Sequence, residues 1–408
     1  MSATTEATAA PLARPETVLT RPLILLFGTS VGVIVTNLFA PQTLVGLIGP
    51  SLGLSTAAAG LVAMATLLGY AAGLFLLVPL ADLVENRRLI LRMLACAAAC
   101  AGLATLAPTA TTLLPVLVLL GAACSAIQIL VPIAAAMAPP ERRGRVIGDV
   151  MGGLMVGILL ARPLASGIAG SFGWRGFYLA SAVAMALLTL VLAARLPRRS
   201  PEARIGYPAL IASLWHLLRQ EPVLRARALT ASLVMAAFSL FWTGVALRLA
   251  QPPFSLGQGG IALFALVGAG GAVVTPLAGR AGDRGWTRPA TLASHLAVIG
   301  GFALAAWAGA APSGGSLWPL VVMGLAAVVL DIGITGDQTL GRRAINMLRP
   351  EARARLNALF VGLFFLGGAA GSAVAGLAWA AGGWPLICLI GAAIGLAAVI
   401  AGRRSRSV

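Results

Sequence analysis

PERRGRVIGDVMGGLMVGILLARPLASGIAGSFGW, residues 140–174, has a second copy further along the same chain. The stretch PEARARLNALFVGLFFLGGAAGSAVAGLAWAAGGW, residues 350–384, lies at a constant offset of 210 positions. It repeats the Pro-Glu start, two arginines, two interior glycines and the closing Gly-Trp. Matches at one fixed offset indicate an internal duplication. We therefore expect two similar halves in the same orientation.

The composition places the chain in a lipid bilayer. Hydrophobic residues make up 59% of its 408 positions and charged residues 10%, which is too apolar for a soluble domain of this length. A helix needs about 20 apolar residues to cross about 30 Å of hydrocarbon. The sequence predicts an all-α integral membrane protein with twelve transmembrane helices in two parallel six-helix repeats. The spans lie near 22–40, 55–80, 89–108, 112–137, 146–170, 176–195, 226–250, 259–278, 288–310, 316–336, 355–380 and 384–402.

Polar segments divide the chain into domains. Residues 1–21 carry no signal-peptide pattern and are expected to form a disordered cytoplasmic tail. The N-terminal half then covers 22–195, a cytoplasmic linker 196–225, the C-terminal half 226–402, and a second cytoplasmic tail 403–408. Within the linker, residues 208–219 have the pattern of an amphipathic helix at the membrane surface.

The basic residues report topology. All 29 are arginines, and 26 of them fall in the two tails and in the loops that follow every second span. This alternation is the positive-inside rule, so we expect both termini in the cytoplasm and the protein in the cell (inner) membrane. No soluble module gathers the arginines with aromatic residues, so nucleic acid is not an expected partner.

Chemistry-bearing motifs are sparse. The four cysteines lie inside predicted spans, and His216 and His295 are isolated, so neither a metal site nor a cofactor is expected. There is no phosphate-binding loop or nucleotide module, so any transport must draw on a gradient. We expect a monomer, and no enzyme activity.

Two loops carry a recognisable motif. VPLADLVENRR at 78–88 and GRAGDRGWTR at 279–288 follow the second span of each half, at equivalent places. Each resembles the Gly-x-x-x-Asp-x-x-Gly-Arg-Arg loop of the major facilitator superfamily. The first copy retains Asp82, Arg87 and Arg88 but has Val78 and Glu85 at the glycine positions. The second has Gly279, Asp283 and Arg284, with Gly285 one position early.

The resemblance implies a conformational latch in these loops. Its residues would be Asp82, Arg87, Arg88, Asp283 and Arg284. An Asp at a helix end can pair with a neighbouring helix in one conformation and separate from it in the other. The alternative is that the arginines only anchor the loops on the cytoplasmic side.

Polar residues inside the first, fourth, seventh and tenth spans recur at helical spacing. A stripe of hydrogen-bonding groups in a membrane helix needs water, a substrate or a partner helix. The resemblance implies that these four helices line a central cavity. Bonds between helices are the competing explanation for any one residue. The cavity candidates are Thr29, Asn37, Gln128, Ser239, Trp242, Thr335 and Gln338, with Phe39 and Phe241 as apolar walls.

Arg162 is a permanent cation in the middle of an apolar span. Such a charge costs about 2.5 to 3.5 kcal/mol near a helix centre, so it must face protein or water. It either binds backbone carbonyls, attracts an anionic substrate, or pairs with a carboxylate. Small residues around it allow close helix packing: Gly148, Gly152, Gly157, Ala161 and Ala165 here, and Gly362, Gly367, Gly368, Gly371 and Ser372 in the second copy. Gly148 and Gly157 also match part of the glycine motif of superfamily antiporters.

Asp331 is the carboxylate that lies well inside a cavity-lining span, whereas Asp149 and Asp337 lie near span ends. A proton carrier must titrate as the protein changes conformation, which makes Asp331 the coupling candidate. The sequence thus predicts an alternating-access secondary transporter, with proton-coupled efflux antiport of small organic solutes or drugs as the leading hypothesis. The alternatives are an uptake symporter or uniporter, and, further off, a channel or membrane-embedded enzyme.

Overall fold

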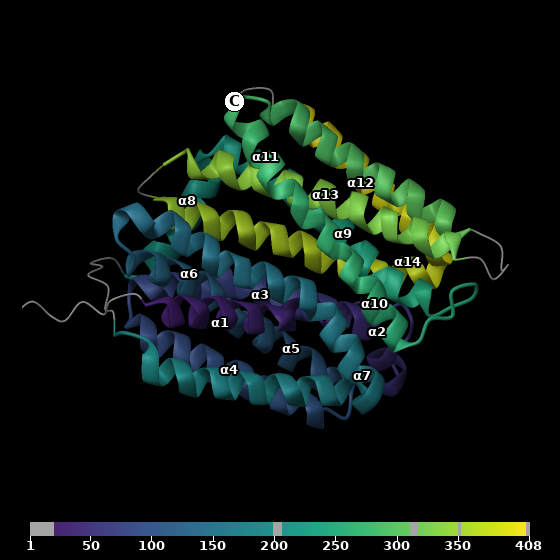
Figure 1. Cartoon of the computed structure of the whole chain (residues 1–408), viewed down its shortest axis with the longest axis horizontal. Coiled ribbons are helices and arrows are strands. Elements are labelled where there is room, and N and C mark those ends of the chain that lie inside the picture. Colours follow the sequence, from purple (N-terminus) through teal and green to yellow (C-terminus); the bar gives the residue numbers. More distant parts are fainter. Residues whose placement is uncertain (1–19, 199–205, 311–316, 350–351, 405–408) are drawn as a thin grey trace, which may run out of the picture.

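The computed structural model describes residues 20–198, 206–310, 317–349 and 352–404, and within these ranges every regular element is a helix. Figure 1 shows the helices up to α7 packed as one bundle and the helices from α9 onward as a second bundle beside it. The N-terminal half contains α1 (Arg21–Phe39), α2 (Pro41–Ser51), α3 (Leu61–Leu76), η1 (Val78–Asp82), α4 (Asn86–Leu106), α5 (Ala110–Cys124), α6 (Ile127–Ala136), η2 (Pro140–Arg142) and α7 (Arg143–Arg195). After α8 (Tyr207–Gln220), the C-terminal half contains α9 (Pro222–Leu249), α10 (Gln258–Ala265), η3 (Leu266–Val273), α11 (Val274–Asp283), α12 (Thr287–Gly309), α13 (Trp318–Asn346) and α14 (Arg353–Arg404).

Nine helices in the described ranges are long and apolar enough to cross a membrane. The two longest, α7 and α14, are each interrupted by one glycine with positive φ, Gly173 at 70° and Gly383 at 62°. Glycine adopts this conformation without the steric penalty of a side chain, so each helix divides into two segments there. The two glycines occupy matching positions in the repeat. The count of twelve requires each segment, and the broken run α10–η3–α11, to cross separately, and it remains a prediction.

The first span is longer than expected. It was predicted to end near residue 40, but Ala40 is itself helical and α2 continues the run as far as Ser51. Pro41 stands at the first position of α2, where its missing N–H costs little. The continuation brings Gln42 and Thr43 into the protein interior.

In the N-terminal half, glycines let α1 and α7 approach backbone to backbone. A Cβ atom on Gly157 would collide with the Gly32 backbone, and one on Gly153 would collide with Gly28. The expectation for Gly148 and Gly152 was wrong, since a Cβ at either would meet nothing within 4 Å. One helix face makes the contact, and these two glycines lie off it.

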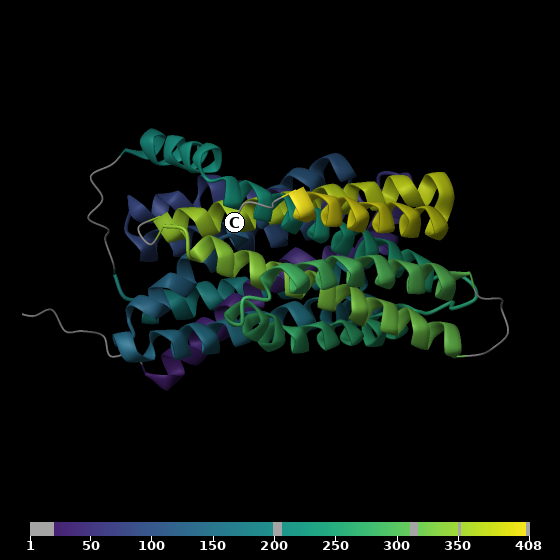
Figure 2. The same cartoon turned by 90° about the horizontal axis from the view of Figure 1, so that it is seen from above.

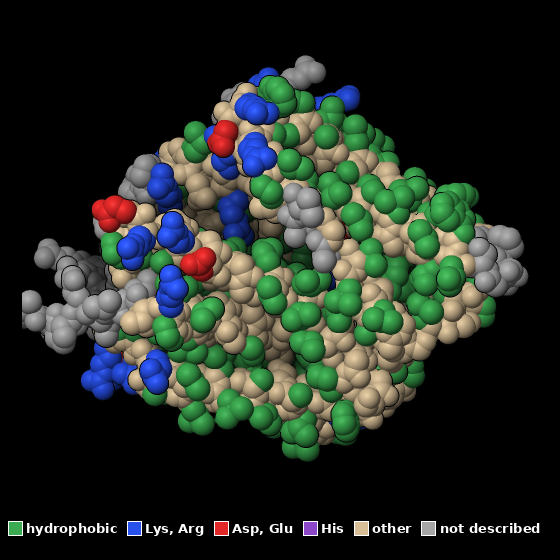
Figure 3. All heavy atoms as spheres, in the orientation of Figure 1, with side chains coloured by type: hydrophobic (Ala, Val, Ile, Leu, Met, Phe, Trp, Pro, Cys, Tyr) green, Lys and Arg blue, Asp and Glu red, His purple; other side chains and the backbone are tan. Residues whose placement is uncertain are grey.

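Most of the arginines that Figure 3 shows on this face lie toward its left, and hydrophobic side chains spread over the rest. This is the arrangement that their alternation along the chain predicts; which compartment that side faces remains a prediction. The expected amphipathic helix is α8, which lies along the edge of the bundle in Figure 2. Leu210, Leu214 and Leu217 form its buried face, while Trp215 is exposed.

Candidate functional site between the two halves

Arg162 is buried between the halves, with 4% of its surface exposed. It lies on α7, one turn beyond the close contact of α7 with α1. Its Nε and Nη2 both donate hydrogen bonds to Oε1 of Gln42, at 3.0 and 2.9 Å. Gln42 belongs to the first turn of α2 in the same half. Two donors that converge on one amide oxygen restrain the orientation of the guanidinium without neutralising its charge.

Three aromatic rings surround this guanidinium. Its central carbon lies 4.2 Å from the ring centroid of Trp242, 4.9 Å from that of Phe238 and 5.3 Å from that of Phe39. Phe238 and Trp242 come from α9 of the C-terminal half, and Phe39 comes from α1. A cation within about 6 Å of an aromatic face is attracted by the ring quadrupole, most strongly by Trp. The rings thus hold the charge in a region that excludes most water.

Asp331, on α13, is the acidic group of the same region, and 6% of its surface is exposed. The Trp242 indole donates a hydrogen bond from Nε1 to Asp331 Oδ1 at 3.1 Å. Arg162 and Asp331 attract one another across the boundary between the halves. No direct ion pair joins them in the described structure, and Trp242 contacts both. Gly271 packs its backbone so closely on Asp331 that a Cβ there would overlap the Asp331 side chain.

These contacts connect residues of both halves, and we term this set of residues the central cluster. Its members from the N-terminal half are Phe39, Gln42 and Arg162, and those from the C-terminal half are Phe238, Ser239, Trp242 and Asp331. Gln42 Nε2 also donates to Ser239 Oγ across the boundary, at 3.5 Å. Every polar member is buried. The cluster therefore places a cation of one half and a carboxylate of the other in one desolvated region.

The sequence predicted part of this cluster. Arg162, Ser239, Trp242 and Asp331 were candidates and lie together, and Phe39 was expected as a wall. Gln42 and Phe238 were missed. Gln42 fell between two predicted spans, although it is the only amide in the apolar run from 38 to 49 and that could have marked it. Phe241 does not contact Arg162 in the described structure. Its ring packs against those of Trp242, Phe302 and Trp384.

The other cavity candidates lie outside the cluster, and their roles remain predictions. Asn37 accepts a hydrogen bond from Ser181 Oγ at 2.6 Å, while its own Nδ2 is buried without a partner in the described structure. Gln128 donates to the Tyr70 hydroxyl at 3.1 Å. Thr29 is exposed, and Thr335 and Gln338 are half-buried.

The first latch motif faces the opposite half. Asp82 ends η1 on the surface and interacts electrostatically with Arg355 at the start of α14. Phe75, one turn before η1, packs against Gly362 of α14. Arg87 donates to the backbone carbonyl of Ala193, and Arg88 pairs with Glu85 at 2.9 Å. Of the charged groups of this motif, the Asp82 carboxylate is the one that interacts across the boundary.

The second latch motif is satisfied within its own half. Asp283 pairs with Arg343 of α13, and the Arg284 guanidinium lies over Trp286 at 5.8 Å. The two copies therefore make different contacts here. A buried pair that was not predicted also lies inside this half, where His295 Nε2 and Asp337 Oδ1 are 2.9 Å apart.

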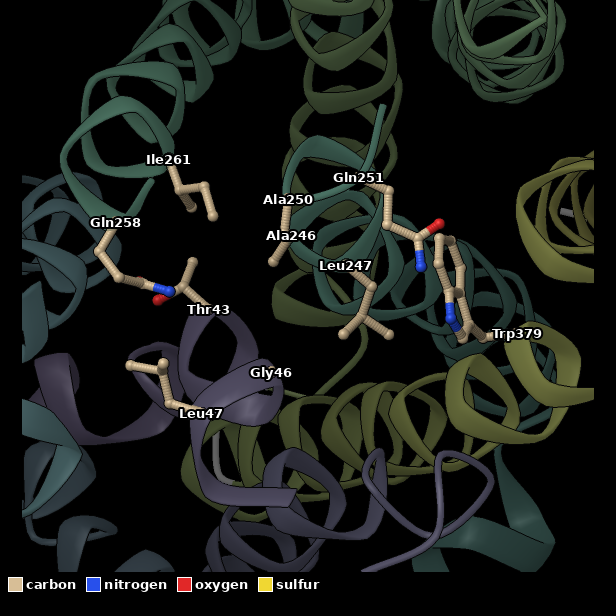
Figure 4. A pocket seen from close by; sticks show the side chains of 10 residues that line it. All are labelled: Thr43, Gly46, Leu47, Ala246, Leu247, Ala250, Gln251, Gln258, Ile261 and Trp379. Atoms are coloured by element: carbon tan, nitrogen blue, oxygen red, sulfur yellow. The ribbon is translucent and has the colours of Figure 1, made fainter. Parts of the chain in front are cut away.

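A pocket of about 250 Å³ lies beyond the central cluster, between α2, α9, α10 and α14 (Figure 4). Gly46 stands four residues after Gln42, and Ala246 four residues after Trp242, so pocket and cluster share helix faces. Figure 4 shows Gln258 and Thr43 at one side of it, and Leu247, Gln251 and Trp379 at the other. Its wall consists of Thr43, Gly46, Leu47, Ala246, Leu247, Ala250, Gln251, Gln258, Ile261 and Trp379.

Residues 23–336 match the family model of the Major Facilitator Superfamily. The chain belongs to this family. It is also 38% identical over 390 residues to the "Uncharacterized transporter YgaY" of Escherichia coli O157:H7, covering 94% of this chain and 96% of that protein. The "Probable transporter SCO4007" of Streptomyces coelicolor is 32% identical over 408 residues, covering 96% and 91% of the two chains.

Solved structures show the same fold. The nucleoside transporter NupG superposes with a TM-score of 0.71 at 16% identity, covering 94% of this chain and 99% of that one. A POT family transporter in complex with 5-aminolevulinic acid gives 0.71 at 14% identity, covering 95% and 97%. At these identities the likeness establishes the fold alone. The superfamily assignment makes the protein a multi-pass membrane transporter that binds small-molecule substrates, and not an enzyme.

Proposed function

We propose that the protein is a proton-coupled antiporter that exports small organic solutes from the cytoplasm, with Asp331 as the group that carries the proton. The observation that supports this is the position of Asp331. Among the described residues, the buried carboxylates are Asp331 and Asp337. Asp331 accepts a hydrogen bond from Trp242, whose ring contacts Arg162 of the other half, whereas Asp337 pairs with His295 inside its own half. A group at that boundary changes its surroundings when the halves rock, as a proton carrier must.

Arg162 supports the proposal as the counter-charge. A carboxylate buried in a membrane protein is costly unless a cation or a proton compensates it. With the halves in contact, the Arg162 guanidinium and the Trp242 hydrogen bond provide part of this compensation. When the halves separate, Arg162 moves with Gln42 in the other half, and Asp331 then requires a proton or another cation.

Asp82 and Arg355 fit the role of a latch for the same motion. Their attraction crosses the boundary at the surface, so it is lost when the halves separate there. The partner of Asp283 is Arg343 of the same half, so that pair is not broken by the same motion.

Reconstitution into liposomes tests the proposed function. Purified protein is reconstituted with an imposed pH gradient, and a pH-sensitive dye reports proton movement as organic cations, organic anions and neutral solutes are added in turn. An antiporter gives proton movement opposite to the solute for at least one compound, and Asp331→Asn abolishes it. Solute flux without proton movement in the wild type would contradict the proposal and favour a uniporter, while parallel movement would favour a symporter.

A further inference from the structure

The central cluster divides unequally when the halves separate. Gln42 holds Arg162 by two hydrogen bonds from within the N-terminal half, so the guanidinium leaves with that half. The C-terminal half keeps Phe238, Trp242 and Asp331. What remains is two aromatic faces beside a carboxylate that has lost its cation, and such a set of groups binds cations.

We propose that the transported solute is a small organic cation of the guanidinium or alkylammonium type, and that Arg162 is a tethered competitor that occupies the cation's place when no solute is bound. This rests on the proposed function and assigns the substrate class of the same site. The solute would stack on Trp242 and Phe238, as Arg162 does in this structure, and would pair with Asp331.

The dimensions of the cluster support a cation of this size. The rings of Trp242, Phe238 and Phe39 lie 4.2 to 5.3 Å from the centre of a planar guanidinium. Asp331 is close enough to attract that group and accepts a hydrogen bond from Trp242. A free guanidinium or a short alkylammonium can take this position once Arg162 has withdrawn.

The sign of proton coupling leads to the same class of solute. A cation pairs with Asp331 only after the proton has left, so cation and proton occupy the carboxylate in turn and can be exchanged. An anion bound to Arg162 would bind better when Asp331 is protonated, because the carboxylate then no longer competes for the guanidinium. Anion and proton would move together. By linkage, antiport at this carboxylate favours a cationic solute over an anionic one.

The surroundings of Asp331 leave few other groups to take part. Arg162 is the charged group that faces it from α7, and α9 presents the Trp242 indole. From η3, Gly268 and Gly271 present backbone. Among the groups described around the carboxylate, its charge is therefore set by Arg162, a proton or a bound cation.

Calorimetric binding to the purified full-length protein tests the proposal, with methylguanidinium as the cationic probe and benzoate as the anionic one. Methylguanidinium should bind. Its Kd should fall by up to about tenfold for each unit by which the pH rises through the range where Asp331 titrates. Asp331→Asn should remove this dependence and most of the affinity. Binding of benzoate but not of methylguanidinium would overturn the proposal, as would methylguanidinium affinity that is independent of pH.

Arg162→Ala gives the sharpest result, because the two explanations of Arg162 predict opposite signs. Removal of a tethered competitor raises methylguanidinium affinity, by about tenfold or more if Arg162 occupies the place most of the time. Removal of an anion-binding residue leaves this affinity unchanged and abolishes benzoate binding. Arg175→Ala is the matched control, because Arg175 lies over Trp174 at the same 4.2 Å but is exposed and far from the cluster. It should change neither affinity.

Gln42→Leu covers the case in which Arg162→Ala does not fold. It keeps the arginine but removes both of the hydrogen bonds that hold the guanidinium in its own half, so Arg162 can remain beside Asp331 and methylguanidinium affinity should fall. Unchanged or tighter binding in this variant would overturn the role of competitor. Proton antiport of an anionic or neutral solute would overturn the substrate class and leave the proposed function standing. Methylguanidinium transport without proton movement would overturn the proposed function and leave the substrate class standing.

Discussion

Each half contains the same kind of close helix crossing, but the residues beside the two crossings differ. In the N-terminal half, α1 and α7 meet at Gly32 and Gly157; in the C-terminal half, α9 and α14 meet at Ala236 and Gly371 and at Ser232 and Gly367. One turn beyond the first crossing stands Arg162. At the same offset of 210 positions, the second crossing has Ser372, whose Oγ lies 3.4 Å from that of Thr243.

This difference separates what the duplication preserves from what it does not. The crossings hold each half together, and both copies need small residues because two backbones must approach closely. The charges differ because they act across the boundary, where one half carries the cation and the other the carboxylate. A symmetric pair of arginines would place two like charges in one desolvated region.

The crossings should give the largest effect. Gly157→Leu and Gly367→Leu each drive a side chain into a facing backbone, and a backbone cannot move aside as a flexible side chain can. We expect each variant to lose most of its folded protein, a destabilisation of more than about 4 kcal/mol. Size-exclusion profiles and thermal unfolding in detergent measure this. Gly148→Leu is the matched control, because its Cβ meets nothing within 4 Å. If it behaved like Gly157→Leu, helix propensity or expression would be responsible instead of the crossing.

Removal of the Asp331 charge from the C-terminal half should give the next largest effect. Asp331→Asn imitates the protonated carboxyl group, so the halves can still rock but no proton is exchanged. We expect accumulation driven by a pH gradient to be lost, and solute exchange down a concentration gradient to persist only at high solute concentration, because the cationic solute has lost its counter-charge. Proteoliposome flux under the two conditions separates these outcomes. If the variant accumulated solute normally, Asp331 would not be the coupling site.

The latch motifs should give a smaller and unequal effect. Asp82→Asn removes the charge that faces Arg355 across the boundary, so transport should fall severalfold or more while insertion and folding persist. Asp283→Asn loses a partner within its own half and should reduce transport less. The comparison is made on initial flux at equal amounts of protein in the membrane. If both variants lost the same share of their initial flux, the interaction of Asp82 across the boundary would have no role that the ion pair of Asp283 within one half does not share.

The halves and the duplication could be predicted from sequence because each rests on a repeated local signal. Apolar runs of span length predict membrane helices, and Gly173 and Gly383 recur because only glycine adopts their backbone conformation cheaply. Arg162 and Asp331 could be singled out because charge inside a span is rare.

The contacts between the halves could not be predicted in the same way. Gln42 of α2 and the α9 residues Phe238 and Trp242 meet Arg162 from two different helices, and no spacing along the chain encodes that meeting. The error at Gly148 and Gly152 has a related cause. Several helix faces carry small residues here, and only the packing partner decides which of them is used, so Gly153 makes the contact.

The smallest effect is expected at Ser372, the counterpart of Arg162. Ser372→Ala removes one long hydroxyl contact with Thr243, and hydrogen bonds between membrane helices contribute about 0.6 kcal/mol on average. The close approach of Gly60 to Ser372 involves the backbone carbonyl, which the change leaves in place. We therefore expect a small drop in unfolding temperature, with methylguanidinium binding and flux unchanged. Arg162→Ala in the same assays should alter binding strongly. If Ser372→Ala also altered binding, the second crossing would belong to the substrate site, and the division of roles between the two halves would have to be abandoned.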